Sequence, residues 1–340
     1  MSLKKVSIKY LANVLGVSVA TVSKALNGYP DVNRSTRDKV IKLAKELQYF
    51  PNQQAVNFRK KSTQTIGLIL PKINHFYFSK IVESIIELAS EDNISVIVKP
   101  TFENLEIEKM ALLELVKLNV DGILISISDE TRFPDHLIEI SNLGIPIVEF
   151  DKISKLSPFD KVVTSDRDAA KKAVDHLITR GKKTIAHLRG PLLSQNSIDR
   201  FLGYKSAITD SGLTFEEELV IQVPPNNINE SQRSFSRLFN KRKDIDGIFA
   251  ITDISAIAAI RELKLQSIDV PGQVSVVGFS NWQISSLTTP RLTTIDQNAF
   301  EMAKASYQKL SDNIETKNNI TGREQETIYI KTDLIIRESS

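Results

Sequence analysis

The fold of the N-terminal part of this chain is decided by the stretch IKYLANVLGVSVATVSKALNG, residues 8–28. From Ile8 to Leu15 its apolar residues recur at i, i+3, i+4 and i+7, the spacing of a short amphipathic helix. Gly16 can supply the left-handed residue that ends this helix, and Ser18 is a typical N-cap for a second one that stops at Asn27 and Gly28. Because residues 16–18 alone separate the two helices, the pattern predicts a steep crossing of the helix-turn-helix kind.

Outward from this stretch, a third helix is predicted over about residues 35–48, with Val40, Ala44 and Leu47 on one face. Pro51 ends it because proline breaks the helical ladder. Residues 1–51 therefore form a small all-α head.

The charge of the chain is divided unevenly between this head and the rest. The formal net charge is +3, but residues 1–62 carry twelve Lys and Arg against three Asp and Glu. That segment is therefore +9 and the remaining 278 residues are −6. A basic head beside a mildly acidic body is typical of a polyanion-binding module joined to a domain with another role. The alternative is that the basic residues only form a solvated surface.

The head resembles the LacI/GalR-type transcriptional regulators, and the resemblance continues through nearly the whole chain. The matching motifs are Ile8, Leu11-Ala12, Gly16-Val17-Ser18, Ala20-Thr21-Val22-Ser23-Lys24, Leu26-Asn27-Gly28, Thr36-Arg37, Val40, Leu47, Tyr49 and Pro51-Asn52. The match is dense and without gaps over some fifty residues. It implies a sequence-specific, homodimeric regulator of transcription, most simply a repressor, that reads a near-palindromic operator.

The resemblance also implies which head residues meet DNA. Val19, Ala20 and Lys24 would face base edges, and Ser18, Thr21, Ser23 and Asn27 would complete the contact, the last three on phosphates. Lys24 departs from the family, which commonly has Arg at this position. Lysine lacks the rigid fork of arginine, so we expect weaker base discrimination there; the alternative is that Lys24 is a surface lysine.

Residues 52–63 are similar to the hinge helix that orders on operator DNA in this family. An isolated helix of two turns is marginal in water, so ordering on DNA is physically reasonable. Ala55, Phe58 and Arg59 would contact the minor groove or phosphate, with Phe58 standing where the family has a Leu wedge. The alternative is that Phe58 packs under the body.

From residue 64 onward, short apolar runs alternate with amphipathic helices, which favours parallel α/β sheets. About 270 residues exceed the usual length of one domain, so two lobes are expected. The resemblance implies a periplasmic-binding-protein-like body whose lobes are joined by three crossings. We expect the first lobe over about 64–161 and 292–340, ending in one strand from Thr327 to Leu334, and the second over about 162–291.

A small effector, implied to be a sugar or sugar derivative, would bind in the cleft between these lobes, at the carboxyl ends of the strands. Arg200 is the strongest candidate, because its fixed fork of donors suits hydroxyls or a carboxylate. The full set of candidates is His75, Tyr77, Phe78, Asp151, Arg200, Asp253, Asn281 and Trp282. Each can also be a capped loop or a packed core residue. Thr252 and Ser280 stand where the family usually has Asn and Asp, which leaves the identity of the effector open.

Other function classes find little support in the sequence. The chain has no Cys, no dinucleotide or phosphate loop, no HExxH and no GxSxG, and its four His are scattered, so we expect no metal, no cofactor and no enzyme activity. No segment has the length and apolarity of a membrane span or signal peptide, and we expect a cytoplasmic protein. A sugar-binding transport component would share the body but would need no DNA-binding head.

Overall fold

The computed structural model describes residues 6–49, 62–73, 76–224, 227–316 and 325–340. The chain divides into two compact units: residues 1–63, which contain the head, and residues 64–340, which we term the body. Among the expected site residues, Ala55, Phe58, Arg59 and His75 lie outside the described residues. No helix in the described ranges is both long and apolar enough to cross a membrane.

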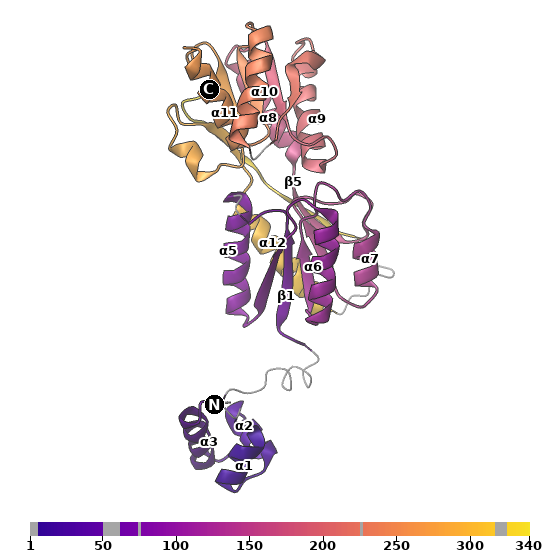
Figure 1. The fold of residues 1–340 in the computed structure, drawn as a ribbon, viewed down its shortest axis with the longest axis vertical. Coiled ribbons are helices and arrows are strands. Elements are labelled where there is room, and N and C mark those ends of the chain that lie inside the picture. The colour runs from indigo at the N-terminus through magenta and orange to yellow at the C-terminus, as the bar shows by residue number, and fades with distance from the viewer. Residues whose placement is uncertain (1–5, 50–61, 74–75, 225–226, 317–324) are drawn as a thin grey trace. The chain divides into compact units, whose positions relative to one another are not determined.

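The described part of the head contains the helices α1 (Ile8–Leu15), α2 (Val19–Leu26) and α3 (Arg34–Glu46) (Figure 1). Gly16 follows α1 in the left-handed conformation, with a φ of +64°. The backbone N–H of Thr21 donates to the Ser18 hydroxyl at 3.0 Å, which caps α2 as expected. The three helices enclose one apolar core, made by Leu11, Ala12, Val22, Ala25, Val32, Val40 and Ala44.

The first lobe of the body is a six-stranded sheet in the order β11-β5-β4-β3-β1-β2, with every recorded pairing parallel. Its strands are β1 (Thr65–Leu70), β2 (Ser95–Pro100), β3 (Gly122–Ile125), β4 (Ile147–Phe150), β5 (Asp160–Thr164) and β11 (Thr327–Ile330). Helices α5 (Phe76–Glu91) and α12 (Ala299–Glu315) cover one face, and α6 (Leu105–Lys117) and α7 (Asp135–Ser141) cover the other. Helices on both faces explain why these strands are continuous apolar runs.

The second lobe repeats this plan with the strand order β12-β10-β9-β8-β6-β7. Its strands are β6 (Ile185–Arg189), β7 (Val220–Gln222), β8 (Gly247–Ala250), β9 (Ser275–Phe279), β10 (Thr293–Asp296) and the antiparallel β12 (Asp333–Ile335). Helices α8 (Asp166–Thr179) and α9 (Gln195–Asp210) pack on one face, and α10 (Ile228–Lys241) and α11 (Asp253–Leu265) on the other. Two short 3-10 helices, η1 (Glu217–Leu219) and η2 (Gln283–Ser286), complete the lobe.

The expected division between the lobes was wrong at the C-terminal side. We expected residues 292–340 in the first lobe, but β10 and β12 belong to the second sheet. The reason is burial: Leu292 and Ile295 have no exposed surface and pack into the two cores of the second lobe. The single strand expected from Thr327 to Leu334 is therefore two strands, β11 and β12, one in each sheet.

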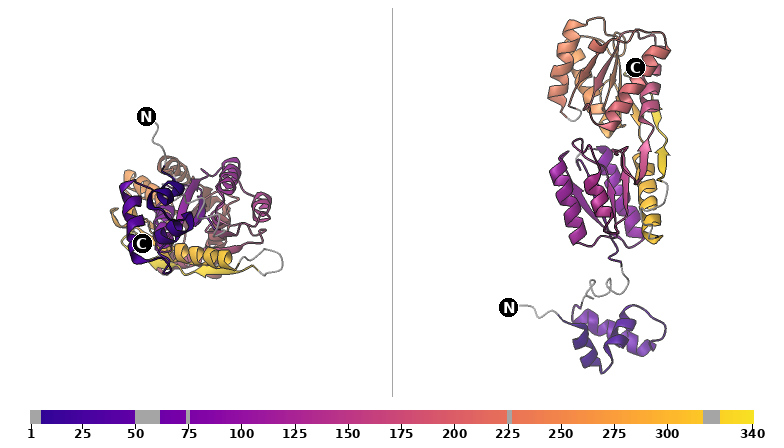
Figure 2. Two further views of the ribbon diagram at one scale, coloured as in Figure 1. Left: turned by 90° about the horizontal axis from the view of Figure 1, so that it is seen from below. Right: turned by 90° about the vertical axis from the view of Figure 1, so that its right-hand side faces the viewer.

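The chain passes between the lobes three times (Figure 2). The crossings lie between β5 and α8, between β10 and α12, and between β11 and β12. β5 continues to Thr164, so the first crossing comes slightly later than the expected boundary at residue 161. All three crossings run past the edges where the parallel strands of the first lobe end, which is where a ligand cleft is expected.

Candidate functional site: a cavity between two lobes and an exposed recognition helix

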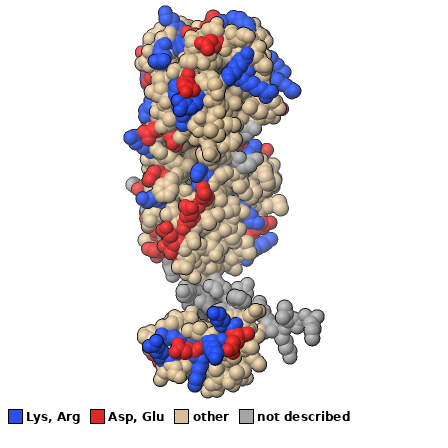
Figure 3. Space-filling model, turned by 90° about the vertical axis from the view of Figure 1, so that its left-hand side faces the viewer, with Lys and Arg blue, Asp and Glu red and all other residues tan. Residues whose placement is uncertain are grey.

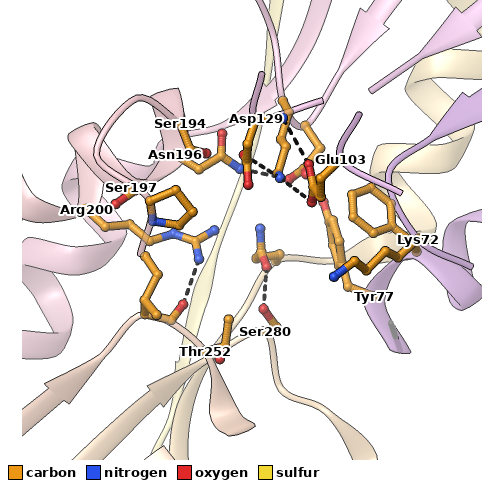
Figure 4. A pocket seen from close by; sticks show the side chains of 16 residues that line it. Lys72, Tyr77, Glu103, Asp129, Ser194, Asn196, Ser197, Arg200, Thr252 and Ser280 are labelled. Atoms are coloured by element: carbon orange, nitrogen blue, oxygen red, sulfur yellow. Dashed lines mark hydrogen bonds and ion pairs between the residues drawn. The ribbon is translucent and has the colours of Figure 1, made fainter. Parts of the chain in front are cut away.

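A cavity that opens to solvent lies between the two lobes, and the space outside protein atoms in it, open solvent included, is about 630 Å³. Its first-lobe residues follow the carboxyl ends of β1 to β4, and its second-lobe residues follow β6, β8, β9 and β10 (Figure 4). The lining residues are Lys72, Tyr77, Phe78, Glu103, Asp129, Asp151, Lys152, Pro191, Ser194, Asn196, Ser197, Arg200, Ile251, Thr252, Ser280 and Gln297. The cavity therefore occupies the position that doubly wound sheets use for ligands.

Arg200 is fixed at the second-lobe wall of this cavity. Its Nε donates to Asp166 Oδ1 at 2.6 Å, and its Nη1 donates to the Ile251 carbonyl at 2.9 Å. The guanidinium carbon lies 3.6 Å from the centre of the Phe279 ring. Its Nη2 donates to none of the described residues, which leaves one end of the planar group available to a ligand.

Asp151 faces Arg200 from the first lobe. It is buried, it has a φ of +56°, and Oδ1 accepts a hydrogen bond from Asn196 Nδ2 of the second lobe at 3.2 Å. Burial, reinforced by the negative charge of Asp166, raises the pKa of the Asp151 carboxyl to about 6. With this pKa the carboxyl is mainly a hydrogen-bond acceptor at pH 7, and it becomes a donor as the pH falls below about 6.

Lys152 closes one end of the cavity through two ion pairs. Its Nζ lies 2.8 Å from Glu103 Oε1 and 2.7 Å from Asp129 Oδ1. Burial lowers the pKa of Lys152, but the two carboxylates outweigh burial and raise it above its usual value. The positive charge is fully used by these partners, so Lys152 provides shape and polarity here rather than a free cation.

Three buried polar atoms of the cavity have no hydrogen-bond partner among the described residues. They are the hydroxyl of Tyr77, the hydroxyl of Ser197 and Nε2 of Gln297, in side chains that are only 4%, 2% and 2% exposed. Burying such a group without a partner costs free energy, and native structures rarely tolerate it unless water or a ligand supplies the bond. These three atoms therefore call for water or a polar ligand as a partner.

The structure brings together part of the expected effector set. Tyr77, Phe78, Asp151 and Arg200 line the cavity, whereas Asp253, Asn281 and Trp282 do not. Asp253 is buried, and its carboxylate accepts from Thr294 Oγ1 and from the backbone N–H of Trp282. Burial outweighs these bonds and raises the pKa of Asp253 to about 7.

Sequence reasoning missed several lining residues. Ser194, Asn196 and Ser197 lie in the loop after β6 and the first turn of α9, where small polar residues look like ordinary helix caps. The Ser194 side chain caps nothing, since it accepts no hydrogen bond from the helix. Thr252 and Ser280, noted above as departures from the family pattern, do line the cavity.

In the head, the expected DNA-contacting residues lie on and around the outer face of α2. Ser18, Val19, Ala20, Lys24 and Asn27 are exposed, and Thr21 and Ser23 are half-buried. Figure 3 shows Lys and Arg side chains on the head with Asp and Glu between them. One such pairing joins the Lys24 ammonium group to the Asp31 carboxylate, which raises the pKa of Lys24 and lowers that of Asp31.

Comparison with known proteins decides the family. Residues 7–52 match the model of the bacterial regulatory proteins of the lacI family. Residues 63–338 match the model described as periplasmic binding proteins and sugar binding domain of LacI family. The chain belongs to the LacI family of bacterial regulators.

This LacI-family regulator is 31% identical over 305 residues to the ribose operon repressor of Bacillus subtilis (strain 168), covering 89% of this chain and 90% of that protein. It shares the fold of the Lac repressor dimer bound to operator and the anti-inducer ONPF, with a TM-score of 0.87, 24% identity and 99% of each chain covered. A LacI-type regulator from Alkaliphilus metalliredigens QYMF, solved with D-xylulofuranose, is 27% identical, with a TM-score of 0.70, over 82% of this chain and 99% of that one. The expected fold and family are confirmed, and the family consists of transcriptional regulators rather than enzymes.

Proposed function

We propose that this LacI-family regulator is a homodimeric repressor whose affinity for a near-palindromic operator changes when a sugar or sugar derivative binds between the lobes. The observation that carries the effector part is the set of unpartnered polar atoms in the cavity, contributed by both lobes. A polyol can satisfy Tyr77, Ser197 and Gln297 at the same time, and in doing so it links the lobes.

Charge balance favours a ligand without a large net charge. Arg200 is paired with Asp166, and Lys152 is shared between Glu103 and Asp129. A strongly anionic ligand would meet three carboxyl groups in the wall, those of Glu103, Asp129 and Asp151. The ribose operon repressor and the D-xylulofuranose complex among the relatives make small sugars the first class to test.

The DNA part of the proposal rests on α2 and on the family of the head. Val19 and Ala20 have no hydrogen-bonding side chain, so their readout is apolar, for example against a thymine methyl group. Lys24 donates to base edges once it leaves Asp31, while Thr21, Ser23 and Asn27 hold the phosphates and Ser18 completes the contact. In this proposal the hinge residues Ala55, Phe58 and Arg59 contact the minor groove between the two half-sites.

Binding between the lobes can reach the head only by changing how the lobes close. The crossings after β5, β10 and β11 lie beside the cavity, and Gln297 of the second crossing lines it. A sugar shifts the operator-competent population only through its different affinity for the two states, and about 5.5 kcal/mol moves it from 1:99 to 99:1.

Isothermal titration calorimetry with D-ribose, D-xylulose and a panel of common mono- and disaccharides tests the cavity. At least one sugar of the panel should bind the wild type, and Tyr77→Phe should weaken that sugar about two- to tenfold through the loss of one neutral hydrogen bond. Arg200→Lys should weaken sugar binding further, because a lysine ammonium group cannot bond to Asp166, the Ile251 carbonyl and a ligand in the fixed geometry of a guanidinium group.

Tyr307→Phe is the matched control, because the Tyr307 hydroxyl bonds to Asp92 at 2.6 Å in the first lobe and lies outside the cavity lining. If Tyr77→Phe binds the sugar as tightly as Tyr307→Phe and the wild type do, the sugar binds outside this cavity. The absence of binding by the whole panel would contradict a sugar effector.

A further inference from the structure

Two aromatic side chains meet across the cleft, one from each lobe. Phe76 is the first residue of α5 in the first lobe, and Trp282 follows β9 in the second lobe. Their ring centroids are 6.3 Å apart and their planes differ by 28°, the geometry of an offset stack. Neither residue lines the cavity, although Tyr77 next to Phe76 and Ser280 near Trp282 do. The contact therefore lies at the rim of the sugar cavity.

The turn that carries Trp282 is held firmly by the second lobe. The Trp282 backbone N–H donates to Asp253 Oδ2 at 2.6 Å, and Asp253 also accepts from Thr294. Asn281 donates to Asp296 at 2.8 Å and accepts from Arg337 at 2.7 Å. Since Trp282 is tied to the buried Asp253, and Asn281 to the half-buried Asp296 and Arg337, the position of this turn is set by its own lobe.

This turn also has an uncommon backbone, which sets it apart from an ordinary loop. Ser280 and Asn281 have φ angles of +103° and +45°, a region that non-glycine residues rarely adopt. The bonds from Asp253 and Arg337 hold the turn in this shape. Asp253, Asn281 and Trp282, expected to bind the effector, do not line the cavity, and together they hold one ring against a ring of the opposite lobe.

Phe76 is placed as firmly on its side. It opens α5 directly before Tyr77 and Phe78, which are buried in the core of the first lobe. Lys80, one turn later, has its ammonium group 6.0 Å from the Phe76 ring centre. Among the described residues, the polar contacts between the lobes include a hydrogen bond from Asn196 to Asp151 at 3.2 Å and a longer, exposed approach of Lys155 to Asp199 at 3.9 Å.

We propose that the Phe76–Trp282 stack is a latch that holds the two lobes together at the cleft rim in the ligand-free protein. Trp282 is then a positioning residue for lobe closure and makes no contact with a sugar. An aromatic pair contributes enough beyond its buried area to change the ratio of open to closed molecules by about two- to tenfold. The inference concerns the free body and does not depend on which effector binds.

The sequence provides two clean probes of the latch, because the chain has a single Trp and no Cys. Cysteines introduced by Leu118→Cys in the first lobe and Leu265→Cys in the second, both at exposed positions, can carry spin labels. Double electron–electron resonance on the full-length protein, diluted with unlabelled protein, then reports the distance between the lobes. Acrylamide quenching of Trp282 fluorescence reports the exposure of the indole itself.

In the ligand-free protein, Phe76→Ala should increase acrylamide quenching and shift the label distances toward a longer, broader distribution. Trp282→Ala should give the same shift, and Trp282→Phe should give little, because a ring remains to stack. The double variant should match either single variant, since each removes the whole contact. Phe133→Ala, which removes an exposed ring on the first lobe far from the rim turn, is the matched control.

The latch is overturned if Phe76→Ala leaves the distance distribution unchanged while quenching rises, because the rings would then touch without holding the lobes. It is also overturned if the shifts of the two single variants add in the double variant. Circular dichroism confirms folding of each variant. The distance and quenching measurements both use the ligand-free protein, so they do not depend on the sugar screen. The latch and the proposed sugar effector can therefore be disproved independently.

Discussion

At the residue scale, the ion pair between Lys24 and Asp31 bears most directly on the proposed DNA contact. Both side chains are about half exposed, so the pair is screened by solvent and can exchange readily. In the free head, Asp31 holds the ammonium group of Lys24 and places a negative charge beside α2. In the proposed DNA contact, Asp31 therefore competes with the operator for Lys24.

We expect Asp31→Asn to raise affinity for DNA, because it frees Lys24 and removes a charge that phosphates repel. Lys24→Ala should lower affinity mainly for the preferred base at one position of each half-site. Fluorescence anisotropy with operator fragments that carry each base at that position measures both effects. An equal loss for all four bases would make Lys24 a phosphate contact instead.

His187 is the second informative residue, since it is buried among aromatic rings in the second lobe. Its ring stacks on Phe249 at 4.9 Å and on Tyr204 at 5.1 Å between centroids. Nδ1 lies 3.1 Å from the Phe249 carbonyl, which can only accept, so Nδ1 carries the proton of a neutral ring. Burial lowers the pKa of His187 to about 3.

This lowered pKa predicts acid instability. Between pH 6.5 and 3, the unfolded chain binds a proton at His187 and the folded chain does not, so the free energy of unfolding falls as the pH falls. Relative to His187→Phe, the wild type should lose about 1.4 kcal/mol per pH unit between pH 5.5 and 4. Urea unfolding of both proteins across this range measures the difference. Burial raises the pKa of the carboxyl groups of Glu149, Asp151 and Asp253, so they contribute with the opposite sign, but they do so equally in both proteins and cancel. Parallel curves would show that His187 is protonated inside the fold.

At the scale of elements, the packing of α8 against α9 is the tightest constraint on the second lobe. A Cβ at Gly203 of α9 would lie 2.1 Å from the Arg167 carbonyl oxygen and 2.9 Å from the Ala170 Cβ of α8. Arg200, which faces the cavity, is one turn earlier on the same helix. The closeness of the two helices therefore determines where the guanidinium group stands.

Gly203→Ala should push α9 away from α8 and destabilise the body by about 1–3 kcal/mol, because the atom it meets is backbone and has no other rotamer. Thr209→Ala, at an exposed position of the same helix, should change stability far less. Chemical denaturation followed by circular dichroism compares the two. A Gly203→Ala protein as stable as the Thr209→Ala protein would mean that the helices separate at no cost.

The elements also show what a sequence can and cannot predict. The head helices were predicted within two residues, because Gly16 and Ser18 mark their ends and the apolar period is regular. The break between β11 and β12 was not predicted, because the residues from Thr327 to Leu334 look like one continuous strand. Only tertiary packing decides which sheet each half of this segment joins. For the same reason Arg200 could be predicted from the family pattern, whereas Ser197 and Gln297 become recognisable only where the lobes meet and leave them unpartnered.

At the scale of the whole molecule, the uneven charge of the sequence is divided between two compact units. The described part of the head carries seven Lys and Arg against three Asp and Glu. A cationic head should bind DNA with a steep dependence on salt. If a dimer contacts about 6–10 phosphates, its affinity should fall by roughly 10³–10⁵ between 50 and 200 mM salt.

The central claim joins the two units: a sugar in the cavity changes the affinity of the head for DNA. The most direct test is fluorescence anisotropy of the wild type on DNA from upstream of its own gene, at 50 mM salt, with and without the sugar that binds in calorimetry. The account predicts specific binding that changes at least tenfold at saturating sugar, with Tyr77→Phe needing about two- to tenfold more sugar for the same change. Specific DNA binding that the bound sugar leaves unchanged, or no binding to these fragments at low salt, would contradict it.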